Sequence, residues 1–360
     1  MFPKVTSLKF SGTPFYPAVD ALYSHIAQQY AHQLQYLDSS HPISSERKFE
    51  MLKHASINGI GVSNYKVPQM SAECLEKLSL YNVPSDFSWN SFEGSEFSNL
   101  YELCVYYTAA SNGNQRIPAR RLLFPKLKVL DVDGISNEYP VFHQAVFPEE
   151  ISRLFISGFG DMYRSIRDIK LPRAKKLGIS TSLDHDDTSQ TVSYMNQIAK
   201  NAARAETVYF RVYNNVPVAA GDVTCTAITV LYLKTQISIE TMLSLIGTLH
   251  NLVDLELGRL IGGDSTVQYV DLPESDEQLL EPFNSKLKCL ALKVEDQPEA
   301  SSNIVDVVIF ILLKLPMLRE LMCEQLAKAF LNKLELYVEA YPKLQTIAYG
   351  ISQDAIDNNE

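Results

Sequence analysis

The sequence lacks the short motifs that commonly hold a catalytic nucleophile, a catalytic metal or a nucleotide phosphate. No GxSxG, HExxH, P-loop or GxGxxG pattern occurs in its 360 residues. It also has no long hydrophobic run, because its most apolar stretch, residues 304–313, is about half as long as a membrane-spanning helix. These absences argue against an enzyme and against a membrane protein.

Basic residues are fewer than acidic ones, 32 against 42, and the formal net charge is −10. Proteins that bind nucleic acid generally present a basic face, so we expect no nucleic-acid partner. The five cysteines show no CxxC or other metal-binding spacing, which is typical of free thiols in a reducing compartment. His185 lies among Asp184, Asp186 and Asp187, which we interpret as a solvated acidic loop. We therefore expect no metal, no cofactor and an intracellular location, in the cytoplasm or the nucleus.

One apolar pattern recurs along the whole chain. It consists of an apolar residue, two variable residues, an apolar residue, one variable residue and an apolar residue, as in segment 127–132, LKVLDV. The units begin about 26 residues apart on average, and self-similarity at that period is typical of a solenoid. Fourteen units begin at Val5, Leu34, Leu52, Leu75, Leu100, Leu127, Ile151, Ala174, Thr207, Ile228, Leu252, Leu287, Leu318 and Leu344.

Alternation with period two predicts that each unit is a short strand with one buried face and one open face. The first, fourth and sixth residues should point into the core, and the third, fifth and seventh to the open face. The roughly 20 residues between strands predict crossovers that make the pairing parallel. We expect almost complete burial for Leu130, Val132, Leu255, Leu257, Leu290 and Leu292.

Several connecting segments have the apolar spacing of a helix. The spacing predicts helices over residues 17–33, 193–203, 239–249, 303–313 and 324–339, and shorter ones over 140–146 and 161–169. A proline often stands just before a strand, as in Phe124-Pro125 and Phe147-Pro148. Proline ends a helix and lacks an amide hydrogen, so it suits the entry to a strand.

The repeats resemble those of the leucine-rich repeat family over nearly the whole chain. Segments 124–130 (FPKLKVL) and 341–344 (YPKL) carry this resemblance, which is to the irregular ribonuclease-inhibitor-like type found in fungal F-box/leucine-rich-repeat proteins. The resemblance implies an α/β solenoid with a curved parallel sheet on its concave face and helices and irregular segments outside. We expect residues 1–351 to form a single solenoid and residues 352–360 a polar tail.

Two features depart from that family. Its consensus places Asn or Cys at the ninth position of the repeat, where the side chain ties adjacent turns through backbone hydrogen bonds. Here Asn215 matches, whereas other units have Val83, Ile135, Phe159, Ser182, Gln236, Leu260 and Glu295. F-box proteins also carry an N-terminal helical module that binds a ubiquitin-ligase adaptor. The chain begins inside a repeat, so we expect either that the sequence lacks its N-terminal part or that the protein works without this module.

The first repeat has no preceding repeat to cover its core residues. Val5, Leu8 and Phe10 should therefore face water in part, because a solenoid without a polar capping unit exposes its end layer. We expect instability or self-association at this N-terminal repeat.

The open-face positions of two consecutive units carry aromatic and basic side chains. Because parallel strands lie about 4.8 Å apart, these side chains should form one patch on the concave face. Tyr and Arg are enriched at binding hot spots, which favours a protein-binding site at Tyr209, Arg211, Tyr213, Tyr232 and Lys234. Tyrosine also suits exposed strands that bind nothing, and the sequence leaves that alternative open.

Other open-face positions form a weaker aromatic cluster and several acidic zones. Lys77, Tyr81 and Tyr106 repeat the aromatic and basic character nearer the N-terminus. The acidic zones are Asp131 with Asp133, Asp254 with Glu256, and Glu320 with Glu324.

Two functions fit these observations. The first is a non-catalytic protein-interaction scaffold, as in an F-box-type substrate-recognition subunit without its docking module. The second is a ribonuclease-inhibitor-like regulator that wraps and inhibits a compact target enzyme. Both require a protein partner, whose identity the sequence does not reveal, and neither involves a membrane.

Overall fold

The structure is a computed structural model of the chain. It describes residues 4–12, 16–58, 68–83, 89, 92–108, 121–134, 145–158, 163–164, 166–167, 169–182, 188–202, 207–213, 220–261, 284, 286–294, 314–315, 317–324 and 348–350. The acidic loop around His185, the ninth-position Asn215 and the helix predicted over residues 303–313 lie outside the described residues.

The chain divides into two compact units. The first comprises residues 1–178 and 201–206, and the second comprises residues 179–200 and 207–360. The prediction of a single solenoid domain over residues 1–351 stays a prediction.

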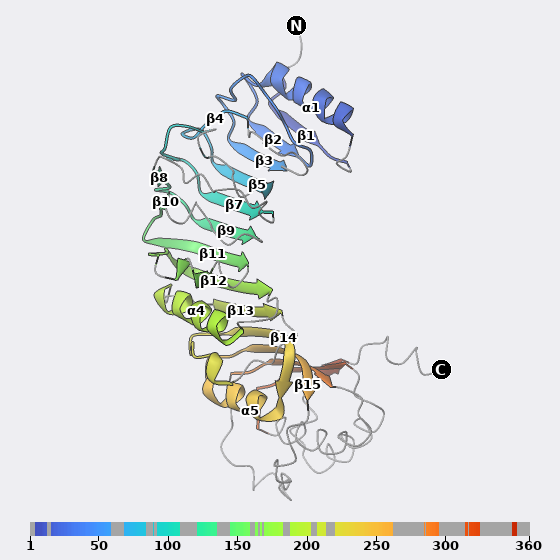
Figure 1. The fold of residues 1–360 in the computed structure, drawn as a ribbon, viewed down its shortest axis with the longest axis vertical. Helices are drawn as coiled ribbons and strands as arrows, with labels where there is room; N and C mark the ends of the chain where they lie inside the picture. Colours follow the sequence, from blue (N-terminus) through green and yellow to red (C-terminus); the bar gives the residue numbers. More distant parts are fainter. Residues whose placement is uncertain are drawn as a thin grey trace, which may run out of the picture. The chain divides into compact units, whose positions relative to one another are not determined.

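Among the described residues, seven strands of the main sheet lie wholly within the first unit and pair in parallel in the order of the sequence (Figure 1). They are β1 (Ser7–Phe10), β2 (Tyr36–Ser39), β3 (His54–Asn58), β5 (Lys77–Val83), β7 (Glu102–Tyr107), β9 (Val129–Gly134) and β11 (Glu150–Gly158).

The second unit continues the same pattern with six strands in the described residues. They are β13 (Thr207–Tyr213), β14 (Val230–Ser238), β15 (Asp254–Ile261), β16 (Cys289–Val294), β17 (Glu320–Glu324) and β18 (Ala348–Gly350). In the strand order β12 (Arg173–Ser182) follows β11 and precedes β13. Each of the fourteen predicted repeat units overlaps one of these strands, which confirms a repeat solenoid built on a parallel sheet.

Alternating burial along the strands separates the core from the open face. Leu130, Val132 and Leu255 have no exposed surface, and Leu257, Leu290 and Leu292 are at most 2% exposed, as predicted. Burial of an aliphatic side chain contributes roughly 1.5 to 3 kcal/mol, so this repeated layer is the main source of stability.

Of the shorter helix predicted over 161–169, Tyr163, Arg164 and Ile166 are helical. Three further predicted helices are present among the described residues. They are α1 (Pro17–Tyr30), α4 (Thr188–Asn201) and α5 (Ile239–Thr248). Ser238 caps α5 by accepting a hydrogen bond from the amide of Thr241 at 3.2 Å, and α5 packs against β14 and the 3-10 turn η2 (Ala220–Asp222).

Two helix predictions need correction. Within the predicted helix 140–146, Ala145 and Val146 instead form the short strand β10, because their backbone pairs with β8 (Leu122–Leu123). Glu324, the first residue of the helix predicted over 324–339, ends strand β17, and the rest of that segment lies outside the described residues.

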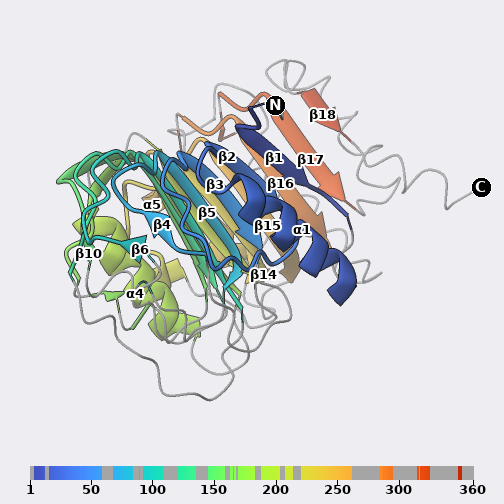
Figure 2. The ribbon, with the colours of Figure 1, turned by 90° about the horizontal axis from the view of Figure 1, so that it is seen from above.

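The N-terminal strand is partly covered by its own helix. Figures 1 and 2 both show α1 beside β1. The ring of Phe10 stacks on Tyr23 of α1 with centroids 4.4 Å apart, and Phe10 is buried. Val5 and Leu8 are only half-buried. The instability or self-association predicted for this end stays a prediction.

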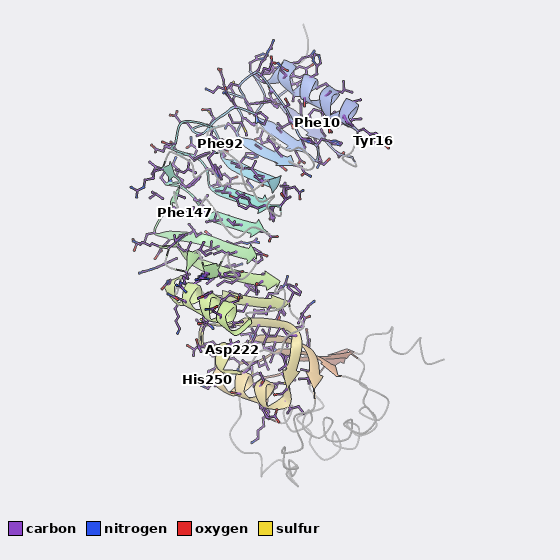
Figure 3. All side chains as sticks on the ribbon, viewed as in Figure 1. Phe10, Tyr16, Phe92, Phe147, Asp222 and His250 are labelled. Carbon is purple, nitrogen blue, oxygen red and sulfur yellow. The ribbon has the colours of Figure 1, made fainter. Side chains whose placement is uncertain are left out.

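A column of aromatic rings fills the side of the first unit where the short strands lie. Phe97 stacks on Phe124 at 4.9 Å, and Phe124 stacks on Phe147 at 5.7 Å. Phe92, of the strand pair β4 (Met70–Ser71) and β6 (Phe92–Glu93), extends the column and is labelled with Phe147 in Figure 3. The Phe-Pro pairs at strand entries therefore have a packing role as well as a backbone role.

Polar ties between adjacent turns occur where the family consensus does not place them. The amide of Asn99 donates to the carbonyl of Glu73 at 2.8 Å, and Lys126 donates to Asn99 Oδ1 at 2.9 Å. The second unit repeats this tie, because Asn251 donates to the carbonyl of Thr226 and Lys286 donates to Asn251 Oδ1. Each of these Asn and Lys residues stands just before the first apolar position of its repeat.

Candidate partner-binding surface

Strands β13 and β14 place the predicted patch on one face of the second unit. Val208, Phe210 and Val212 of β13 are buried, so the residues between them point to the open face. The register pairs Arg211 with Tyr232 and Tyr213 with Lys234, as the repeat count predicts. We call Tyr209, Arg211, Tyr213, Tyr232 and Lys234 the tyrosine–arginine patch.

Cations and aromatic rings alternate within this patch. The guanidinium of Arg211 lies 5.2 Å from the centroid of the Tyr232 ring and 5.7 Å from that of Tyr213. The ammonium of Lys234 lies 5.5 Å from the Tyr213 centroid. Each such contact contributes about 0.5 to 1 kcal/mol at an exposed site. The contacts therefore hold the long cationic side chains in defined positions before any partner arrives.

Arg211 differs from Lys234 in its charge environment. Lys234 forms an ion pair with Glu256 on the next strand at 3.4 Å. Arg211 is exposed and has no carboxylate within ion-pair distance in the described part of the chain. Its planar donors therefore remain available to an acidic group from outside, and guanidinium recognises carboxylates in a two-pronged geometry.

Two acidic residues that the sequence assigns to a separate zone belong to the same surface. The hydroxyl of Tyr232 donates to Asp254 at 3.0 Å, and Glu256 pairs with Lys234. Burial, together with the hydrogen bond to Asp254, raises the pKa of Tyr232 to about 12, so the phenol remains a donor at neutral pH. Burial also raises the pKa of Asp254, whereas the Tyr232 hydrogen bond opposes that shift. The sequence could have indicated this connection. Counting the repeat positions from β14 to β15 places Glu256 beside Tyr232, as the structure shows.

The weaker aromatic cluster of the first unit has a different construction. Tyr81 and Tyr106 stack at 4.9 Å, but Lys77 is held by Glu102 at 2.8 Å. Its cation is therefore already compensated, unlike Arg211.

The acidic zone predicted at Asp131 and Asp133 needs correction. Asp131 is only 8% exposed, because the neighbouring strands bring Tyr106 and Arg153 over it at 3.3 and 3.4 Å. Asp133 is half-buried. Asp131 is thus a buried acceptor for its neighbours Tyr106 and Arg153 and not an exposed charge.

No group of three His, Cys, Asp or Glu residues in the described ranges has the arrangement of a metal site. Cys74, Cys104, Cys225 and Cys289 carry free thiols. Of the helices that the structure describes, none has the length and apolar character needed to cross a membrane.

Comparisons of the chain with models of protein families, with curated protein sequences and with solved structures found no match.

Proposed function

We propose that this protein is a non-catalytic interaction scaffold that binds a partner protein through the tyrosine–arginine patch of its second unit. The partner surface would present a carboxylate to Arg211 and apolar or mixed groups to the tyrosine rings. Asp254 and Glu256 at the edge of the patch would meet basic or hydroxyl groups of the same partner.

The arrangement of Arg211 is the observation that carries this proposal. Two tyrosine rings hold its guanidinium, and no carboxylate of the described chain neutralises it. Ordering a free arginine side chain on binding costs about 0.5 to 1.5 kcal/mol, and a side chain that is already held avoids part of that cost. Tyrosine adds contact area with little further loss of rotamer freedom.

The proposal includes membership of the leucine-rich repeat family. A parallel sheet of sequential neighbours and the segment 124–130 support it. Within that family the partner would be a substrate captured by an F-box-type recognition subunit. In the alternative, this protein is a ribonuclease-inhibitor-like regulator, and its partner is a compact enzyme that it wraps and inhibits.

The test compares two matched variants as baits in affinity purification. The patch variant carries Tyr209→Ala and Arg211→Ala, and the control carries Tyr81→Ala and Arg47→Ala. The pairs match because Tyr209 is 39% and Tyr81 37% exposed, and both arginines are exposed without an ion pair among the described residues. A partner retained by the wild type and the control but lost by the patch variant, and then shown to bind as a purified protein, supports the proposal. Equal retention by both variants would contradict it.

A second arm separates the two kinds of partner. The purified chain is mixed with a ubiquitin-ligase adaptor, with and without the recovered partner. A ternary complex supports substrate recognition. Inhibition of an enzymatic activity of the partner, without adaptor binding, supports the regulator instead.

A further inference from the structure

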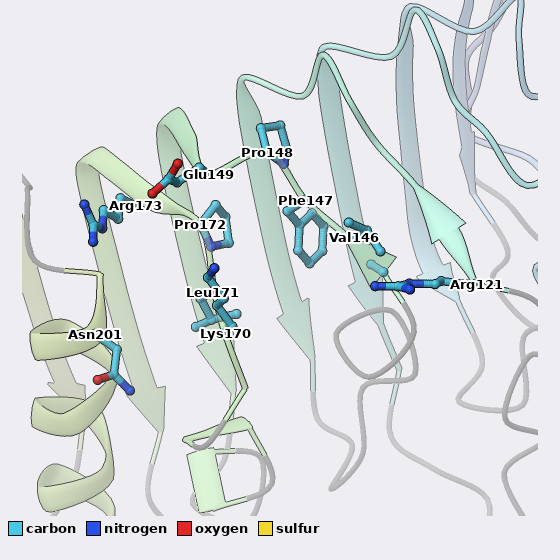
Figure 4. A pocket seen from close by; sticks show the side chains of 11 residues that line it. Arg121, Val146, Phe147, Pro148, Glu149, Lys170, Leu171, Pro172, Arg173 and Asn201 are labelled. Carbon is cyan, nitrogen blue, oxygen red and sulfur yellow. The ribbon is translucent and has the colours of Figure 1, made fainter.

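The first unit contains a cavity of about 520 Å³ that is separate from the tyrosine–arginine patch. Its walls come from the segments that lead into β8, β11 and β12, and every lining residue belongs to the first unit. The volume lies within the range of small-molecule sites, which is about 300 to 1,000 Å³. Figure 4 shows Arg121 at one end of this cavity and Arg173 at the other. We call it the basic pocket.

Its charge is opposite to that of the chain as a whole. Arg121, Lys170 and Arg173 line the basic pocket, and Glu149 is its one carboxylate. None of these three cations has an ion-pair partner in the described part of the chain. The lining therefore carries a formal charge of about +2 in a protein whose net charge is −10. Like charges that lie unpaired around one cavity repel each other, and an anion bound between them relieves that repulsion.

The polar end of the pocket is fixed by the backbone. The amide of Arg173 donates to the carbonyl of Glu149 at 2.9 Å, which holds these two neighbours at the start of their strands. Asn201 also lines the pocket, and its amide donates to the carbonyl of Arg167 at 3.3 Å. A smaller cavity of about 300 Å³ shares Arg173 and adds Lys128, Lys175 and Glu150, so the added residues carry one net positive charge.

The middle of the pocket is apolar. Phe147 stacks on Phe124 of the aromatic column, and this stack supports its ring. Val146, Pro148 and Pro172 complete this wall. A ligand in the pocket would thus place a ring or another apolar body on Phe147 and an anionic group on a cationic side chain at one end of the pocket.

We propose that the basic pocket binds a small organic phosphate monoester with an apolar or aromatic body. A phosphate monoester carries about −1.5 to −2 charges at neutral pH, which matches the charge of the lining. Arginine binds phosphate oxygens through two parallel N–H donors, and Lys170 supplies a further point charge.

The test uses phenyl phosphate as the probe, with inorganic phosphate and phenol as its charged and aromatic halves. Titration calorimetry at 150 mM salt limits long-range charge effects, because the screening length is then about 8 Å. We expect saturable binding of phenyl phosphate, at least tenfold tighter than that of either half. Absence of saturable binding at millimolar concentration would overturn the proposal.

Matched variants locate the binding. Arg121→Gln with Lys170→Gln should weaken phenyl phosphate binding at least tenfold. Lys4→Gln with Arg47→Gln, which lowers the net charge equally at exposed positions elsewhere in the first unit, should change it less than twofold. Equal losses in both variants, or no loss in either, would overturn the assignment. All the replaced side chains are exposed, so folding should be unaffected, as circular dichroism will show.

Two further arms identify the source of the phosphate and separate this site from the partner surface. If a phosphotyrosine peptide binds more than tenfold more tightly than phenyl phosphate, the ligand of the basic pocket is a phosphorylated protein and not a small molecule. Arg211→Ala should leave phenyl phosphate binding unchanged, so failure of either proposal can be recognised without the other.

Discussion

The hydroxyl of Tyr106 donates a hydrogen bond to one oxygen of Asp131 at 3.3 Å, and the other oxygen of that carboxylate has no partner among the described residues. Arg153 approaches the shared oxygen at 3.4 Å, but its own side chain is 53% exposed, so solvent screens the pair. Burial is the largest influence on this acid and raises its pKa, while Arg153 and Tyr106 oppose the shift. Asp131 therefore makes the open face of the first unit sensitive to pH.

The first prediction concerns Asp131→Asn. Because the pKa of Asp131 is raised above the ordinary aspartate value of 3.8, the folded state holds the proton to higher pH than the unfolded state. This acid therefore favours folding at low pH, and its contribution is lost as pH rises from about 4 through its folded-state pKa. The amide cannot ionise, so the stability of Asp131→Asn relative to wild type should increase over that interval. Urea unfolding at a series of pH values measures it.

The control for this prediction is Asp133→Asn, which removes the same charge from the same strand. An equal pH-dependent gain in that variant would indicate a general charge effect and would contradict the role of Asp131.

The second prediction concerns Asn196, a buried side chain of α4 in the second unit. Its amide donates to the carbonyls of Val192 at 2.9 Å and Asp222 at 2.6 Å, and its oxygen accepts from the amides of Thr224 and Cys225. Asn196→Ala leaves several of these buried backbone groups without partners, which should lower the free energy of unfolding by about 1 to 3 kcal/mol. Denaturant unfolding should show it, whereas the exposed Asn251→Ala should cost less. Equal costs would mean that the buried network adds nothing.

The third prediction compares two glycines of the second unit. A Cβ at Gly258 would lie 2.5 Å from the carbonyl oxygen of Thr235 on the neighbouring strand, where the register between β14 and β15 shifts. The backbone of Thr235 cannot move away without a cost in free energy, so Gly258→Ala should destabilise the protein by roughly 1 to 3 kcal/mol. A Cβ at Gly247 in α5 meets nothing within 4 Å, so Gly247→Ala should stabilise it by about 0.5 to 1 kcal/mol. Thermal unfolding of both variants tests the opposite signs, and a shift of both in the same direction would refute this comparison.

The strands and the patch could be predicted from the sequence because both depend on one local rule. Alternation at period two identifies the buried positions of each repeat. Residues at the same position of adjacent repeats pair with each other, which gives the register of the strands. Tyr209 therefore lies beside Val230 and Arg211 beside Tyr232, as the repeat count requires.

The remaining features depend on contacts between segments far apart in the sequence. The tie from Lys126 to Asn99 joins residues in consecutive turns, and no consensus position indicates it. Asp131 has the same local pattern as an exposed fifth-position residue, and only its neighbours Tyr106 and Arg153 bury it. The basic pocket likewise combines Arg121 with Arg173, which belong to different sequence repeats of the first unit.

The fourth prediction concerns the energetics of the tyrosine–arginine patch. Arg211→Lys keeps the positive charge but loses the planar group between Tyr213 and Tyr232. The compact, strongly hydrated ammonium makes poorer contact with both rings and with a carboxylate, so partner affinity should fall by roughly 0.5 to 2 kcal/mol. Unfolding free energy should change by less than about 0.5 kcal/mol, because the side chain is exposed. Titration calorimetry with the purified partner and urea unfolding measure the two quantities.

The matched comparison for this last prediction is Asp254→Asn with Glu256→Gln, which neutralises the acidic edge of the same surface. If Arg211 recognises an acidic group of the partner, removing these neighbouring negative charges should not abolish binding. It should instead lower affinity by less than Arg211→Ala, for which a hot spot implies about 2 to 4 kcal/mol. Intact binding in Arg211→Ala, together with lost binding in the acidic-edge variant, would place the site on β15 and would reverse the charge expected of the partner.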